Sequence, residues 1–118
     1  MTKVLIVEDS PDLQECFAAI FHYRNYSVQM AHSQKTVENL LSVFSPDIIL
    51  MDVKLSGESG RDICKRLKEN IAKNIPIVLI SANPELLLEP EACMADDTLE
   101  KPFSLQLLYE KIDKYLPA

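Results

Sequence analysis

Cysteine and histidine are scarce in this sequence, and their spacing argues against a metal or disulfide framework. Cys16, Cys64 and Cys93 lie far apart and are odd in number, so no Cys-x-x-Cys or Cys/His spacing marks a zinc site. Three such thiols are typical of a reduced, cytosolic protein. His22 and His32 also have no ligand partner at metal-binding spacing, and we expect both to be surface or boundary residues.

Long apolar runs are missing as well. The longest run is far shorter than the roughly 20 residues that a membrane-spanning helix needs. The acidic pair Glu8 and Asp9 interrupts the apolar stretch near the N-terminus, which excludes a typical signal peptide. We therefore expect a cytoplasmic protein with no membrane partner.

The sequence has no dense run of lysine and arginine. Its formal net charge is −6, which disfavours non-specific attraction to DNA, RNA or anionic lipid. We therefore expect no direct nucleic-acid binding. We also see no internal repeat, low-complexity tract or linker, and 118 residues suit one domain, residues 1–118, that can bury a core without staples.

Short apolar runs alternate with segments of helical periodicity along the whole chain. Ser10, followed by Pro11, and Ser33 are suitable N-caps for the first two helices. We expect further helices over about 61–70 and from Ser104. Buried strands are predicted at 3–7, 26–31, 47–51, 75–80 and around Thr98 and Leu99.

This alternation predicts an α/β fold with a doubly wound, five-stranded parallel sheet and helices on both faces. The predicted strands lack polar alternation, which fits a sheet that is covered on both sides. Right-handed crossovers restrict the topology, and we expect the strand order 2-1-3-4-5, with strands numbered along the chain.

Polar residues follow the predicted strands where each of them ends. Ligands of open parallel sheets bind beyond the carboxyl ends of the strands, at the switch point of the strand order. In the order 2-1-3-4-5 the first and third strands are neighbours, so Asp9 should lie close to Asp52. The residues expected at this edge are Glu8, Asp9, Asp52, Ser81 and Lys101.

This set of side chains is suited to phosphoryl transfer. Carboxylates about 5 Å apart repel each other by on the order of 3 kcal/mol per pair, so the cluster must hold a proton or a cation. Mg²⁺ needs only one or two carboxylates plus water and a phosphate oxygen. A lysine and a serine hydroxyl can stabilise the transferring phosphoryl group, and Asp52 is then the nucleophile that becomes an aspartyl phosphate. Taken one at a time, the same residues could be caps, turn residues or surface charges.

Four stretches, in this order and spacing, make the chain similar to a known family over nearly its whole length. They are "VLIVEDSP", "PDIILMDVKLSGESG", "IPIVLISA" and "DDTLEKPF". The chain resembles the receiver domain of two-component response regulators, which has a flavodoxin-like fold. The resemblance implies that Asp52 is the phosphoacceptor, that Ser81 is the switch hydroxyl and that Lys101 ion-pairs with the phosphoryl group.

The same resemblance implies a metal site for Mg²⁺ or Mn²⁺. Asp9 would bind the metal directly, Glu8 through water, and Lys54 through its backbone carbonyl, with Asp52 completing the set. A sensor histidine kinase or a histidine phosphotransfer protein would present phosphohistidine to Asp52. Phosphorylation would then switch the binding of an unknown downstream effector.

Such a chain is a signalling phosphoacceptor rather than an enzyme, although it promotes its own phosphorylation and dephosphorylation. We expect no output domain after the last helix. Two other functions stay open. A pseudo-receiver would never be phosphorylated, but it would be expected to lack an acidic or lysine position. A magnesium-dependent phosphohydrolase of the haloacid-dehalogenase type would need a second acid two residues after Asp52, where Lys54 stands.

The sequence departs from the receiver pattern at several positions. Thr98 stands where many receivers have Tyr or Phe, Met94 where Gly is common, and Ser56 where Pro is frequent. The segment between Ser81 and Lys101 is shorter than usual, so we expect the fourth helix to be short, displaced or disordered. The leucine triplet 86–88 fits either packing beneath this segment or a partner-binding patch.

Overall fold

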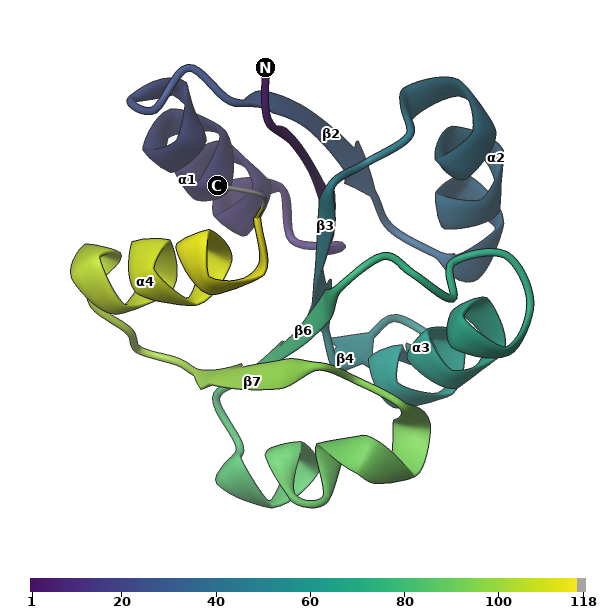
Figure 1. Cartoon of the computed structure of the whole chain (residues 1–118). Coiled ribbons are helices and arrows are strands. Elements are labelled where there is room, and N and C mark those ends of the chain that lie inside the picture. The colour runs from purple at the N-terminus through teal and green to yellow at the C-terminus, as the bar shows by residue number, and fades with distance from the viewer. Residues whose placement is uncertain (117–118) are drawn as a thin grey trace.

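Five parallel strands form the central sheet of the computed structural model, which describes residues 1–116 (Figure 1). The last two residues of the predicted 1–118 domain lie outside the described residues. The sheet order is β2-β1-β3-β6-β7, and every neighbouring pair is parallel. Because β4 and β5 form a separate hairpin, β6 and β7 are the fourth and fifth strands of this sheet. The predicted order 2-1-3-4-5 is therefore confirmed. The strands are β1 Lys3–Val7, β2 Ser27–Ala31, β3 Ile48–Asp52, β6 Ile77–Ser81 and β7 Asp97–Glu100.

Four α-helices cover the sheet, two on each face (Figure 1). Each begins after a serine whose side chain accepts a backbone N–H of the first turn, and such a cap contributes about 1 kcal/mol. Helices α1 and α4 lie on one face, and α2 and α3 on the other. They are α1 Pro11–His22, α2 Gln34–Phe44, α3 Gly60–Glu69 and α4 Leu105–Tyr115.

The core lies on both sides of the sheet because successive strand residues point to opposite faces. In β1, Leu5 and Val7 pack toward α2 and α3, while Val4 and Ile6 pack toward α1 and α4. Each of these side chains is at most 1% exposed. Full burial of such a side chain contributes about 1.5–3 kcal/mol, so the uninterrupted apolar runs are explained by a two-sided core.

A short hairpin follows β3, although the serines and glycines at positions 56, 57, 59 and 60 predict a loop by their residue types. Its strands, β4 Lys54–Leu55 and β5 Glu58–Ser59, pair antiparallel. The two residues between them form the turn, and Gly57 has a φ of 75°, a value that glycine adopts without steric cost. The loop prediction was therefore wrong here, because four residues are enough to pair once a glycine closes the turn.

The proline-containing segment before β7 forms two 3₁₀ helices, η1 Pro84–Leu87 and η2 Pro90–Cys93. Of the three expectations for this segment, short, displaced or disordered, the structure shows the first, in the form of two 3₁₀ turns in place of an α-helix. Each proline occupies the first position of its turn, where its missing N–H costs no hydrogen bond. Met94, which stands where a glycine is common, has a left-handed φ of 65°.

The leucine triplet is divided between core and surface. Leu87 is buried and Leu86 packs partly against the core beside α3, whereas Leu88 is 64% exposed. Leu86 and Leu87 therefore pack as the first interpretation expects, and only Leu88 has the surface position that a partner-binding patch requires.

Among residues 1–116 the structure has no helix that is both long and apolar enough to cross a membrane.

Candidate functional site

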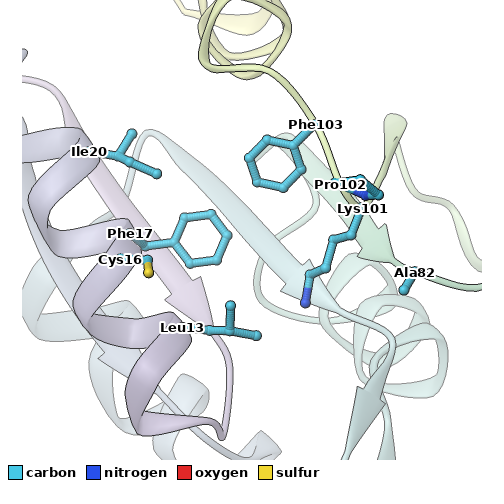
Figure 2. Close-up of a pocket in the computed structure, with 8 residues that line it drawn as sticks. All are labelled: Leu13, Cys16, Phe17, Ile20, Ala82, Lys101, Pro102 and Phe103. Atoms are coloured by element: carbon cyan, nitrogen blue, oxygen red, sulfur yellow. The ribbon is translucent and has the colours of Figure 1, made fainter.

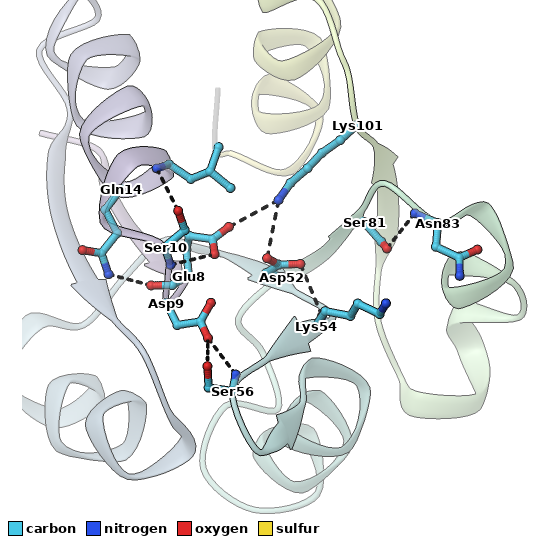
Figure 3. Close-up of polar contacts among 11 residues, drawn as sticks. Glu8, Asp9, Ser10, Gln14, Asp52, Lys54, Ser56, Ser81, Asn83 and Lys101 are labelled. Atoms are coloured by element: carbon cyan, nitrogen blue, oxygen red, sulfur yellow. Dashed lines mark hydrogen bonds and ion pairs between the residues drawn. The ribbon is translucent and has the colours of Figure 1, made fainter.

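The strand register places the polar residues of the sequence at one edge of the sheet (Figure 3). Val7 of β1 pairs with Met51 of β3, so Glu8 and Asp52 follow side by side. On the other side of β3, Asp52 pairs with Ile80 of β6, one residue before Ser81. The edge therefore collects side chains from positions 8, 52 and 81, which are distant in the sequence.

Lys101 connects two of the carboxylates. Its Nζ lies 3.3 Å from Glu8 Oε1 and 3.4 Å from Asp52 Oδ2. The backbone N–H of Lys101 donates to the Ser81 carbonyl at 2.9 Å, and the Lys101–Pro102 peptide bond is cis. The three side chains are 19%, 3% and 12% exposed, respectively, so their charges interact more strongly than they would in water.

Glu8 carries a carboxyl group that is unfavourable in its ionised form. Burial raises the pKa of Glu8, and the neighbouring Asp52 carboxylate raises it further, while the Ser10 N–H and Lys101 only partly oppose this. The Ser10 N–H donates to Glu8 Oε2 at 3.1 Å. The Gln14 amide also donates to the Glu8 carbonyl at 2.6 Å. The backbone and side chain of Glu8 are therefore both fixed in a position where extra positive charge would be stabilising.

Asp9 is held by the hairpin that follows β3. Its Oδ2 accepts the Ser56 hydroxyl at 2.6 Å and the Ser56 N–H at 2.7 Å. These two hydrogen bonds lower the pKa of Asp9, because both donors stabilise the ionised carboxylate. Figure 3 shows the Asp9 carboxylate between Glu8 and the Ser56 turn.

A pocket of about 320 Å³ opens beside Asp52. Asp52 Oδ1 accepts the Lys54 N–H at 3.3 Å. The Ser81 hydroxyl oxygen accepts the Asn83 N–H at 3.0 Å, and this leaves the hydroxyl hydrogen free to donate. The pocket is lined by Asp52, Lys54, Ser81, Ala82, Asn83 and Lys101. Asp52, Lys54, Ser81 and Lys101 are four of the six residues predicted for the site. The other two, Glu8 and Asp9, do not line this pocket.

A second, more apolar pocket lies on the other side of Lys101 (Figure 2). It has a volume of about 390 Å³ and lies between α1 and the chain after β7. Leu13, Phe17 and Phe103 form much of its wall, and Figure 2 shows the Lys101 stem beside them. The lysine stem therefore packs on apolar surface while its ammonium reaches the carboxylates.

The donor set fits a hard divalent cation in its chemistry. Within residues 1–116, no three or more His, Cys, Asp or Glu side chains already converge as a metal-binding group; Asp9 faces Ser56 and the Lys101 ammonium lies between Glu8 and Asp52. The side-chain oxygens at this edge are nevertheless those of carboxylates, which are ligands that Mg²⁺ and Mn²⁺ prefer. A cation here would also offset the unfavourable charge of Glu8.

The first turn of α3 packs directly against β3. A Cβ atom on Gly60 would lie 2.1 Å from the Asp52 carbonyl oxygen, so only glycine fits this contact. The Gly60 N–H donates to the Val53 carbonyl at 2.8 Å. Helix α3 and the Asp52 backbone are therefore held together without an intervening side chain.

The sequence did not indicate three residues that shape this site. Gln14 fixes the Glu8 backbone, and Arg61 donates to the carbonyls of Leu86, Leu88 and Glu89 at 2.8–3.0 Å. For Ser56 the sequence does offer a signal, since it replaces a frequent proline, and proline could donate neither of the two hydrogen bonds to Asp9.

Comparison with known proteins gives a consistent result. The family model for the response regulator receiver domain matches residues 4–113. The nisin biosynthesis regulatory protein NisR of Lactococcus lactis subsp. lactis is 30% identical over 113 residues, which cover 94% of this chain and 48% of that protein. The chain thus spans about half the length of NisR. Sporulation initiation phosphotransferase F of Bacillus subtilis strain 168 is 29% identical over 117 residues, 98% of this chain and 94% of that protein.

Solved structures share the arrangement. The chemotaxis protein CheY4 of Vibrio cholerae superposes with a TM-score of 0.87 at 25% identity, over 98% of this chain and 99% of that one. The signal receiver domain of a signal transduction histidine kinase from Syntrophus aciditrophicus has a TM-score of 0.87 at 28% identity, over 98% and 90% of the two chains.

Proposed function

This chain belongs to the response regulator receiver domain family, and from that premise we propose that it accepts a phosphoryl group on Asp52 and thereby switches the binding of a partner. One observation supports this above the others. A single ammonium, that of Lys101, bridges Glu8 and Asp52 beside a pocket that the Ser81 hydroxyl also lines.

The reaction is a transfer between two nucleophiles. An oxygen of the ionised Asp52 carboxylate attacks the phosphorus of a phosphohistidine, and a new P–O bond forms while the P–N bond breaks. The imidazole leaves with the electron pair of that bond. The transition state spreads negative charge over the phosphoryl oxygens, so the site must supply positive charge and donors.

Residues of the pocket can supply both. The Lys101 ammonium can move from Glu8 toward the phosphoryl oxygens, and the free hydrogen of the Ser81 hydroxyl can donate to one of them. The cation would be held by Glu8, Asp9, Asp52 and the Lys54 carbonyl. When bound, Mg²⁺ or Mn²⁺ would offset the charge that develops on the transferred group.

The phosphoryl donor would be a sensor histidine kinase or a histidine phosphotransfer protein, with an effector of unknown identity downstream. The similarity to a phosphotransferase of the sporulation pathway and to the receiver of a histidine kinase supports a role in such a relay. In this role the chain is a cytoplasmic signalling phosphoacceptor rather than an enzyme with a released product.

Incubation with acetyl phosphate and Mg²⁺, followed by intact-mass measurement, tests the proposal. We expect the wild type and the exposed-site control Asp12→Asn to gain the mass of one phosphoryl group, and Asp52→Asn and an EDTA-treated sample to gain none. A wild type that never gains mass would instead support the pseudo-receiver. Steady release of phosphate over many turnovers without mass gain would support the phosphohydrolase.

A further inference from the structure

Ser56, in the turn between β4 and β5, makes two hydrogen bonds to one oxygen of Asp9. The residues are 47 positions apart, and the hydroxyl and the backbone N–H reach Asp9 Oδ2 at 2.6 and 2.7 Å. Both distances are in the short range typical of bonds to ionised acceptors. The contact therefore holds the Asp9 side chain in one orientation.

The turn that presents Ser56 is itself fixed. Leu55 pairs with Glu58 across the hairpin, and Gly57 takes the positive φ that the turn needs. The Glu58 carboxylate accepts the N–H of Gln34 at the start of α2, at 3.1 Å. The hairpin is thus anchored to a neighbouring helix, and Ser56 is in place before any ligand arrives.

The two hydrogen bonds give the two oxygens of the Asp9 carboxylate different roles. Oδ2 is occupied by both Ser56 donors, while Oδ1 keeps its lone pairs for another partner. Ligating carboxylates in metal sites are commonly oriented in this way by hydrogen bonds to the oxygen that does not bind the metal, and loss of such a bond typically weakens metal affinity about 10–100-fold.

We propose that Ser56 is a positioning residue that orients the Asp9 carboxylate for a hard divalent cation at the edge of the sheet. This inference rests on the proposed function, because it assumes that Asp9 binds the cation. Ser56 itself does not touch the metal or the phosphoryl group; it fixes one ligand and so reduces the freedom that this ligand loses on binding.

Calorimetric titration of the metal-free chain with Mg²⁺ alone tests the proposal. Ser56→Ala keeps the backbone donor and removes the hydroxyl, so we expect its Kd to rise about tenfold, at the lower end of the range for such contacts. Ser56→Thr keeps a hydroxyl and should bind within about twofold of the wild type. Ser42→Ala, an exposed serine of α2, is the matched control and should bind unchanged.

Thermal unfolding separates positioning from a general loss of structure. Ser56→Ala loses one exposed hydrogen bond to Asp9, so in EDTA its Tm should fall by only about 1–4 °C. The rise of Tm with added Mg²⁺ should be smaller than in the wild type. A Kd for Ser56→Ala equal to or lower than that of the wild type would overturn the inference alone. Failure of the wild type to bind Mg²⁺ would overturn both the inference and the metal part of the proposed function.

Discussion

At the scale of single residues, the carboxyl group of Glu8 is less favourable in its ionised form in the folded state than in the unfolded chain. Its pKa is raised above the ordinary value of 4.5, first by burial and then by Asp52. Stability from such a group is complete below the ordinary pKa and is lost as the pH rises through the raised value. Glu8 therefore weakens the metal-free fold at neutral pH.

We predict that Glu8→Gln raises the Tm in EDTA at pH 7 by a few degrees, since each kcal/mol moves the Tm of a domain of this size by roughly 3–6 °C. The difference from the wild type should shrink as the pH falls toward 4. Thermal unfolding over this pH range measures it, with the exposed Glu15→Gln as control. A lower Tm for Glu8→Gln at pH 7 would show that its pairing with Lys101 outweighs its burial.

Lys54 is the exposed cation of the Asp52 pocket, and Figure 3 shows its side chain directed toward the Asn83 side. We predict that Lys54→Ala shortens the lifetime of the phosphorylated state about two- to fivefold, because an exposed ion pair is worth about 0.5–1 kcal/mol. Loss of phosphoryl mass over time, after removal of the donor, gives the rate. Lys65→Ala on α3 is the control, and an unchanged rate in Lys54→Ala would refute the contact.

Proximity of the charged residues could be predicted from the sequence, but the contacts of individual side chains could not. Glu8 follows β1 directly, and Asp52 and Ser81 are the last residues of β3 and β6, so the sheet order alone brings them together. The Ser56–Asp9 bonds depend on a two-residue turn inside a hairpin of four paired residues, which carries too little apolar pattern to be recognised.

At the scale of elements, Arg61 fastens the segment with η1 and η2 to α3. Its guanidinium donates to the Leu86, Leu88 and Glu89 carbonyls. We predict that Arg61→Ala lowers the free energy of unfolding by about 1–2 kcal/mol. This is less than three hydrogen bonds from a charged donor would contribute if buried, because these bonds are partly exposed to solvent. Hydrogen exchange should rise within 84–94 and stay unchanged in β1. The exposed Arg66→Ala should alter neither, and equal exchange in both variants would show that the carbonyl contacts are not stabilising.

Leu87, the last residue of η1, and Leu88, which follows it, offer a matched pair. Leu87 is 9% exposed and Leu88 is 64% exposed. Leu87→Asp should destabilise the fold by about 3 kcal/mol or more because it buries an unpaired charge, whereas Leu88→Asp should leave the Tm within about 1–2 °C of the wild type. Similar Tm values for the two variants would contradict this division of the triplet.

The starts of the four helices and the bounds of the first four strands of the sheet were predicted to within about two residues, because periodicity and serine caps mark them. The conformation of the 84–94 segment could be predicted only as short, displaced or disordered, since two prolines and three adjacent leucines match neither a helical nor a strand period. Its shape is decided by tertiary contacts, those of Arg61 and the burial of Leu87.

At the scale of the whole molecule, the two clusters of the core meet through one sheet. We predict that residues 1–118 unfold as a single cooperative unit, with equal calorimetric and van't Hoff enthalpies of about 80 kcal/mol near 60 °C. Scanning calorimetry measures both. Two separate transitions would show that the faces of the sheet unfold independently and would contradict the prediction of one domain.

The strand order was the whole-molecule property that the sequence predicted best, because parallel pairing and right-handed crossovers leave few alternatives. That order also spreads the charged edge over the full chain: its acidic members precede residue 53, and the lysine that bridges two of them is residue 101. A ribosome that makes the chain from its amino end therefore releases the acids first. The nascent polypeptide carries them without their lysine until β7 and Lys101 have been synthesised, so charge balance at this edge is achieved only after the last strand of the sheet has been made.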